Sequence, residues 1–222
     1  MAMLYALIAL LFKEPGNTNI LLLSLNLLAT FTVPLARILL FPKRILKKLS
    51  FRTQTFLDIM IFLGSFLGQG MEFNHKITSY DKFLHLVAGA VILLIGNELV
   101  DMFKEYDDKI SPLLRTFTAT GFSFVAIALW EVFEFFVDYY WPESSNQAYN
   151  ISPERDPFFF KIFGYGAQNE NQWAVFDTNV DMFCAIIGAI PAAIILATYL
   201  NKKNNRKNKS NTHKTEKEKV NI

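Results

Sequence analysis

The sequence predicts an all-α protein, a polytopic bundle of about six transmembrane helices with both termini in the cytoplasm. Of its 222 residues, 52% are hydrophobic and 19% are charged, whereas soluble proteins average about 25% charged residues. The apolar residues, 22 Phe among them, are collected in blocks, several of them long enough to cross a bilayer. Lys and Arg crowd into a few segments between these blocks, which is typical of membrane topology rather than of nucleic-acid binding.

The first two apolar segments are residues 1–12 and 19–41. Twelve residues also fit a signal sequence or a span whose start has been lost, but no positively charged segment precedes them, so we favour a short first span. Residues 19–41 form a clear second span, in which Pro34 predicts a kink. A third span is expected at residues 53–70, where two glycines four residues apart, Gly64 and Gly68, allow a neighbouring helix to approach closely.

Three more spans are expected at residues 81–103, 117–141 and 176–200. The loop between the last two carries several prolines and is too irregular for a span, but its aromatic segment 158–163 could lie on the membrane surface. Residues 201–222 form a basic tail without apolar periodicity, and we expect this tail to be disordered.

Basic residues give the bundle an orientation. The basic segments 42–52, 104–115 and 201–222 lie on one side of the membrane if each later span crosses once, and that side is the cytoplasm. The loops 74–80 and 142–172 are then external. The sequence therefore predicts a multi-pass protein of the cell membrane that contacts lipids and binds no nucleic acid.

Three carboxylates lie inside the fifth expected span. Glu131, Glu134 and Asp138 occur at spacings of three and four in the segment Trp-Glu-Val-Phe-Glu-Phe-Phe-Val-Asp, so they share one face of a helix. Acidic residues within a span are costly, face the protein interior or a wet cavity, and usually have a function.

The predicted topology brings further polar residues to the same depth. The outer starts of the fourth and sixth spans carry polar residues one turn apart, and with the two glutamates they are expected to surround one pocket open to the outer face. The small residues Gly89, Ala185, Gly188 and Ala189 should let these helices approach closely. The candidate residues are Asp81, His85, Glu131, Glu134, Asp177 and Asp181. Lys82 is expected to point to another face of its helix.

Simpler explanations exist for several of these residues. Asp81 and Asp177 are also explained as caps of helix N-termini, and Asp138 as a residue of the headgroup region. His85 and Asp181 could instead provide hydrogen bonds between helices. The only cysteine, Cys184, is expected to be a small buried hydrophobic residue without a disulfide.

The candidate site has many carboxylates and few basic partners inside the membrane. Either some acids are protonated or a cation is bound. Carboxylate oxygens with one imidazole suit Mg²⁺, Mn²⁺ or Zn²⁺, although no established motif such as His-Glu-x-x-His is present. All six candidate residues are therefore possible metal ligands, and Glu131, Glu134 and His85 are the candidate catalytic residues.

Three motifs carry a resemblance to a known family. Tyr-Asp-Lys-Phe-Leu-His at 80–85, Trp-Glu-x-x-Glu-Phe at 130–135, and Asp-Thr-x-x-Asp-Met at 177–182 followed by Gly188-Ala189 resemble the YjdF-like family of inner-membrane proteins. The resemblance covers about the third to the sixth span. It implies a six-span helical membrane protein that shares the six candidate residues, and it supplies no reaction.

A looser similarity links the chain to VanZ-like proteins. These also pair an Asp-Lys-x-x-His helix start with a later acidic motif and an Asp-plus-Gly helix, and they are associated with resistance to glycopeptide antibiotics, which act at the outer membrane face. This chain departs from their pattern because Glu134 stands where a His-Gln pair is expected and the later Asn-x-x-Gly pattern is missing.

Three functions remain compatible with these observations. The first is an enzyme that acts on a lipid-linked or cell-envelope substrate at the outer leaflet by metal or acid–base chemistry. The second is a proton- or cation-coupled transporter, although the sequence shows no internal repeat. The third is a structural membrane protein whose acids hold helices together.

Overall fold

The computed structural model describes residues 50–70, 73–103, 110–140, 153–154, 156–163 and 170–220. Across these ranges the secondary structure is helical and no strand occurs, which confirms the all-α expectation. The expected spans at residues 1–12 and 19–41, with Pro34, lie outside the described residues.

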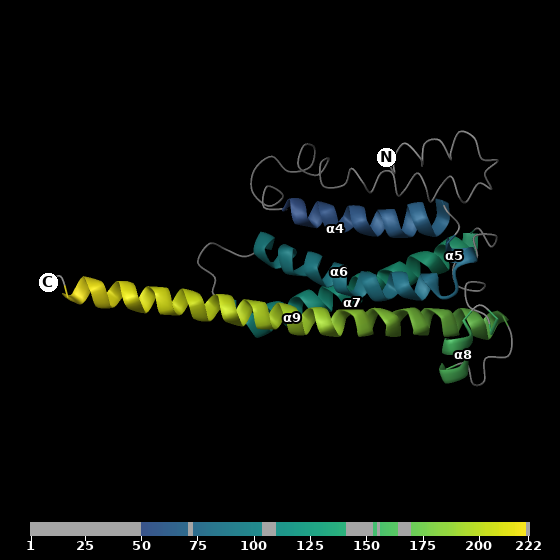
Figure 1. Ribbon diagram of the computed structural model, residues 1–222. Helices are drawn as coiled ribbons and strands as arrows, with labels where there is room; N and C mark the ends of the chain where they lie inside the picture. The colour runs from purple at the N-terminus through teal and green to yellow at the C-terminus, as the bar shows by residue number, and fades with distance from the viewer. Residues whose placement is uncertain are drawn as a thin grey trace.

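Three long helices form the centre of the bundle. Figure 1 shows α6, α7 and α9 side by side, with α4 along one side and the short α8 across one end. Helix α6 packs against both α7 and α9, and α7 also packs against α9. In chain order the elements are α4 (Phe51–Ile61), the π-helix η3 (Phe62–Gly70), α5 (Phe73–Lys76), α6 (Tyr80–Phe103), α7 (Pro112–Tyr140), α8 (Pro157–Phe163) and α9 (Glu170–Val220).

The described helices include three that are long and apolar enough to cross a membrane, namely Tyr80–Phe103, Pro112–Tyr140 and the Gln172–Ser210 part of α9. They coincide with the expected fourth, fifth and sixth spans. The expected third span is a helix that changes character at Phe62, where α4 continues as η3. The Leu63 carbonyl in η3 accepts a hydrogen bond from the Tyr80 hydroxyl at 2.9 Å, so the π-segment is tied to the start of α6.

The interface between α6 and α9 depends on small residues. A Cβ atom added to Gly89 would overlap the Ala185 carbonyl oxygen, and one added to Gly188 would overlap the Leu86 carbonyl oxygen. The two backbones therefore touch, as expected from the small residues at these positions. Because Gly89 lies four residues after His85 in α6 and Ala185 lies four residues after Asp181 in α9, this contact also brings the polar residues of the two helices together.

The close approach expected at Gly64 and Gly68 is not seen in the described part of the chain. A Cβ at Gly64 would meet no described atom within 4 Å, and one at Gly68 would face the Asn74 side chain at 3.0 Å. Both glycines lie in η3.

Helices α6 and α7 run in opposite directions and are joined at two levels. The Ser123 hydroxyl donates to the Gly89 carbonyl at 3.0 Å in the buried interface. At the other end of the bundle, Arg115 Nε donates to Asn97 Oδ1 at 2.6 Å, and Arg115 Nη1 donates to Asp101 Oδ1 at 2.6 Å. These contacts fix the register that places α7 carboxylates opposite the start of α6.

Helix α9 continues to Val220, where the sequence led us to expect a disordered tail after residue 200. Neither Gly nor Pro follows Pro191 in the helix, and the Lys and Arg residues of this segment have good helix propensity. A helix already nucleated by its packed part extends at little cost. With 51 residues α9 is about 76 Å long and projects beyond the other helices (Figure 1).

Candidate functional site

A sharp turn sets the start of α6 and with it the first side chains of the site. Ser79 has a φ of 57°, and its hydroxyl donates to Asp156 Oδ1 at 2.6 Å. Asp156 is buried and directly precedes α8, so the turn before α6 is joined to the start of α8. The edge-to-face contact of Phe73 with Tyr80 packs the first residue of α6.

Lys82 is the functional residue that the sequence interpretation placed wrongly. Its side chain is 2% exposed and enters the acidic cluster, with Nζ 3.0 Å from Asp81 Oδ2 and 2.8 Å from Asp181 Oδ2. Nζ also forms an ion pair with Asp177 Oδ1. One lysine on α6 therefore holds an aspartate of its own helix and two aspartates of α9.

The position of Lys82 follows from helix periodicity. Gly89 lies seven residues further along α6 and touches α9, and Leu93, eleven residues further, is buried with Ala189 of α9. Residues spaced by seven and eleven share one face of a helix, so Lys82 belongs to the face that packs against α9. That spacing was visible in the sequence and was the signal that could have identified Lys82.

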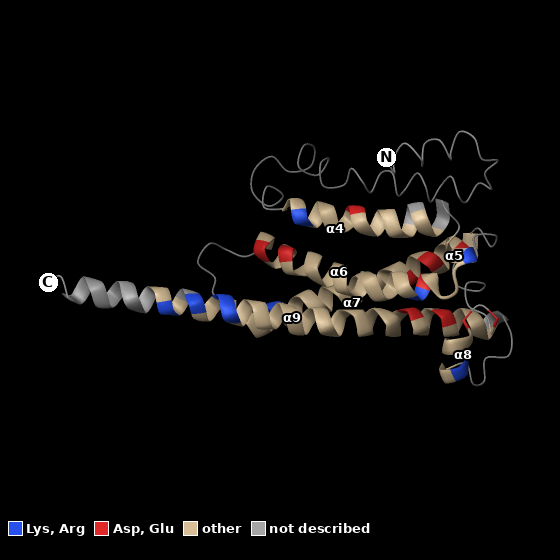
Figure 2. Cartoon of the chain, viewed as in Figure 1, with Lys and Arg blue, Asp and Glu red and all other residues tan. Residues whose placement is uncertain are grey.

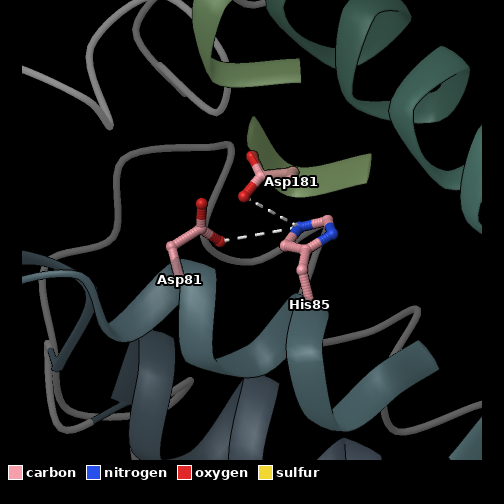
Figure 3. Close-up of side chains that lie close together, drawn as sticks. All are labelled: Asp81, His85 and Asp181. Carbon is pink, nitrogen blue, oxygen red and sulfur yellow. Dashed lines mark ion pairs between the residues drawn. The ribbon is translucent and has the colours of Figure 1, made fainter. Parts of the chain in front are cut away.

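His85 lies one turn below Asp81 and is 6% exposed. Its Nε2 atom is 3.8 Å from Asp81 Oδ1 and 4.0 Å from Asp181 Oδ1, and its Nδ1 atom is 3.6 Å from Glu131 Oε1. Figure 3 shows Asp81 and Asp181 both directed at the same edge of the imidazole ring. Both ring nitrogens thus face carboxylates, which come from all three central helices.

The two glutamates of α7 reach the site from different depths. Glu131 is 4% exposed and lies in the helix interface. Glu134 is half-buried and accepts a hydrogen bond from Trp130 Nε1 at 2.8 Å. Ligand atoms of His85, Glu131 and Glu134 lie within 4.8 Å of one another. The predicted inward stripe of α7 therefore holds for these two residues.

The structure divides the six predicted metal ligands. The described residues contain two groups with metal-ligand spacing, one of Asp81, His85 and Asp181 and one of His85, Glu131 and Glu134. Asp177 belongs to neither group and instead pairs with Lys82. Asp138, the third acid of the predicted stripe, also belongs to neither group.

The acidic cluster contains a positive charge that the sequence interpretation did not place there, the Lys82 ammonium. Figure 2 shows acidic residues of α6, α7 and α9 at the end of the bundle near α5 and α8, with a basic residue among them, and further acidic residues at the opposite end of α6. Five carboxylates still accompany the Lys82 ammonium, so a further cation or protons are needed to balance the cluster. Cys184 next to this region is free, buried and packed with Val180, as expected for a small hydrophobic residue.

Comparison with known proteins matches this chain to a family. Residues 1–202 match the family described as "Predicted membrane protein (DUF2238)". The chain belongs to this family. The resemblance to YjdF-like proteins is confirmed, because these proteins form the DUF2238 family. An uncharacterized protein of Thermotoga maritima is 32% identical over 97 residues, which are 43% of this chain and 49% of that protein. The match thus spans about half the length of that relative. No solved structure matches.

Membership of the DUF2238 family shows that the chain is a membrane protein and specifies no activity. Within this DUF2238 protein the clustered side chains lie toward one end of the long helices. Asp81, Lys82 and His85 fall in the first six residues of α6, within about 9 Å of its start along the helix axis. These three side chains therefore lie near one end of α6.

Proposed function

We propose that this DUF2238 protein is a multi-pass enzyme of the cell membrane that acts on a lipid-linked or cell-envelope substrate at the outer leaflet. The observation that carries the proposal is the buried His85 imidazole, which lies among carboxylates from three helices near one end of the bundle. Such a constellation is suited to general acid–base chemistry, since an imidazole oriented by a carboxylate can take up and release a proton.

The three candidate catalytic residues take different roles in this proposal. Glu134 is the more exposed of the two glutamates and is the group that a substrate reaches from the bundle end. Glu131 is buried 3.6 Å from His85 Nδ1 and orients the ring. His85 transfers a proton to or from the substrate, and Glu134 acts as the second acid–base group.

The position of His85 near the start of α6 favours an enzyme over a transporter, whereas Glu131, nine residues or about 14 Å before the end of α7, does not distinguish the two. Substrate and coupling-ion sites of transporters lie near the bilayer midplane, about 15 Å from either edge of the hydrocarbon core. His85 lies in the second turn of its span. The positive-inside rule supports a place for this end of the bundle at the outer face, because Arg115 pairs with Asp101 near the other end of α6 and the basic residues from Lys202 onward follow the last apolar segment.

A proton- or cation-coupled carrier is the second candidate. The excess of carboxylates over Lys82 favours it, since carboxylates that exchange protons or cations are what coupling requires. A third role, in which the cluster only holds the helices together, predicts that neutral substitutions leave function unchanged.

Substitution of the glutamates distinguishes these roles. We expect Glu134→Gln and Glu131→Gln to reproduce the phenotype of a deletion strain, with the same lipid-linked or envelope precursor accumulating in mass-spectrometric lipid profiles. Both variants should fold, because glutamine keeps the shape and removes a charge from the interior. The matched control is Glu98→Gln, near the other end of α6, which should retain the wild-type lipid profile.

Two results would contradict the proposal that the protein is an enzyme. One is a normal lipid profile in a strain that carries Glu134→Gln in place of the wild type. The other is ion flux driven by a pH gradient in proteoliposomes that Glu134→Gln abolishes, which would favour the carrier. If both glutamine variants behave as wild type in both assays, the cluster is structural.

A further inference from the structure

We infer that Asp81, His85 and Asp181 bind one divalent transition-metal ion and that Lys82 positions the two aspartates for it. The ligand atoms are Asp81 Oδ1, His85 Nε2 and Asp181 Oδ1, which lie within 4.8 Å of one another. The inference deepens the proposed enzyme by naming its cofactor, and it rests on that function only for what the metal does. With the ion bound, both ring nitrogens of His85 are engaged, so the proton transfer assigned above to His85 falls to Glu134.

The distances around His85 fit an ion better than direct hydrogen bonds. Nε2 is 3.8 Å from Asp81 Oδ1 and 4.0 Å from Asp181 Oδ1, and both separations exceed the range of a hydrogen bond. Two ligands about 2.1 Å from a shared tetrahedral ion are about 3.4 Å apart. A movement of a few tenths of an ångström would bring each of the two His85–aspartate separations to this value, and the two aspartate oxygens, which lie within 4.8 Å of each other, would approach the ion with them.

An unsatisfied oxygen points into the same space. Asp181 is fully buried, and its Oδ1 atom has no hydrogen-bond partner among the described residues. A buried carboxylate oxygen without a partner is costly, and a metal ion would supply the missing interaction.

Lys82 explains why these oxygens face His85. Its ammonium binds Oδ2 of Asp81 and Oδ2 of Asp181, so the Oδ1 atom of each aspartate is left on the side of the imidazole. Asp177 binds the ammonium from a third direction through Oδ1, and it lies outside both groups with metal-ligand spacing. Lys82 is thus a positioning residue, and the carboxylates of the cluster outnumber its charge, so a divalent ion is not repelled.

Glu131 completes the arrangement on the far side of the ring. Its Oε1 atom is 3.6 Å from His85 Nδ1. Metal-binding histidines commonly donate their second ring nitrogen to a carboxylate, which fixes the tautomer that presents the other nitrogen to the ion. At 3.6 Å the two atoms face each other beyond hydrogen-bond distance, and a small approach of Glu131 on metal binding would let it accept the Nδ1 proton and leave Nε2 as the ligand.

The donor set selects the class of metal. One imidazole nitrogen with two carboxylate oxygens suits Zn²⁺ or Mn²⁺, whereas Ca²⁺ and Mg²⁺ prefer oxygen ligands alone. Three protein ligands also leave coordination positions for water or substrate, as in catalytic rather than structural zinc sites.

Metal binding by the purified full-length chain tests the inference without any substrate. The protein, carrying a tag without histidines, is stripped with a chelator and titrated with Zn²⁺ by calorimetry and with Co²⁺ by visible absorption. We expect one ion per chain in the wild type, and affinity at least 100-fold weaker in His85→Ala and in Asp181→Asn. Lys82→Met should keep the stoichiometry and weaken binding 10- to 100-fold. Glu98→Gln and Cys184→Ser are controls that should bind as the wild type does.

The binding measurements can overturn the metal site independently of the proposed enzyme. Failure of the wild type to bind either ion, or equal affinity in the wild type, His85→Ala and Asp181→Asn, overturns the site. Gel filtration and thermal melting of each variant show whether it is folded, and the two ligand variants lie on different helices, so one can replace the other if it fails to fold. Because Glu134 is not a ligand, a metal-binding chain with a normal lipid profile in Glu134→Gln would leave this site intact and reject the proposed enzyme.

Discussion

Substitution of Lys82 by methionine tests whether the buried ion-pair network stabilises the bundle. Methionine keeps an unbranched side chain of similar length and removes the ammonium. Lys82 is 2% exposed, and its partners Asp177 and Asp181 are equally shielded from water. The substitution therefore leaves three aspartates facing one another in the helix interface without the cation that joins them.

The expected loss of stability can be estimated from the contacts. Lys82 Nζ is 3.0 Å from Asp81 and 2.8 Å from Asp181, and unit charges about 3 Å apart attract by roughly 5 kcal/mol at an effective dielectric constant of about 20. Desolvation of the ammonium and repulsion among the aspartates offset much of this attraction. Removal of one partner from a buried pair costs about 3–5 kcal/mol, and we expect Lys82→Met to fall in this range.

Thermal unfolding in detergent, followed by gel filtration with fluorescence detection, measures the effect. For a chain of this size the loss corresponds to a Tm lower by about 6–20 °C. Lys202→Met, at an exposed position of α9, is the matched control and should leave the Tm unchanged. The double variant Lys82→Met/Asp177→Asn should recover about 1–2 kcal/mol, because it removes a carboxylate that Lys82→Met leaves unpaired. A wild-type Tm in Lys82→Met, or no recovery in the double variant, would refute the reasoning.

Three further predictions concern packing, topology and the tail. Gly89→Val should destabilise the chain by about 1–3 kcal/mol because the new side chain meets the α9 backbone, whereas Gly121→Val, in open space, should be tolerated in the same melting assay. Reporter fusions should show cytoplasmic activity after Leu200 and external activity near Asn150, and a cytoplasmic 142–172 loop would overturn the outer-face assignment. Deletion of residues 202–222 should leave the Tm and metal binding unchanged, and loss of the folded core would show that the tail does more than extend α9.

The sequence by itself determined the class of protein and the helices that matter. Apolar blocks longer than about 18 residues identified the helices that became α6, α7 and α9, because hydrophobicity over such a length is a local property. The acids at spacings of three and four identified Glu131 and Glu134 as one face of α7. The small residues Gly89 and Gly188 indicated a tight interface, which the structure confirms.

The local sequence pattern did not determine the secondary structure of the tail or of the third expected span. The tail has no apolar periodicity, yet it is helical as the continuation of a helix nucleated by packing. The third expected span changes to a π-helix at Phe62, where the Tyr80 hydroxyl from another helix binds the Leu63 carbonyl. Both features depend on neighbours that composition does not reveal.

Only the tertiary structure decided how the charged residues are paired. Six acids and a histidine were visible in the sequence, but which oxygen faces which nitrogen depends on the rotation of each helix and on a backbone contact between α6 and α9. That contact turns Lys82 toward Asp177 and Asp181, so a residue expected on another face becomes the centre of the ion-pair network. Electrostatic energies fall off with distance and depend on burial, and both quantities are fixed only when the helices pack.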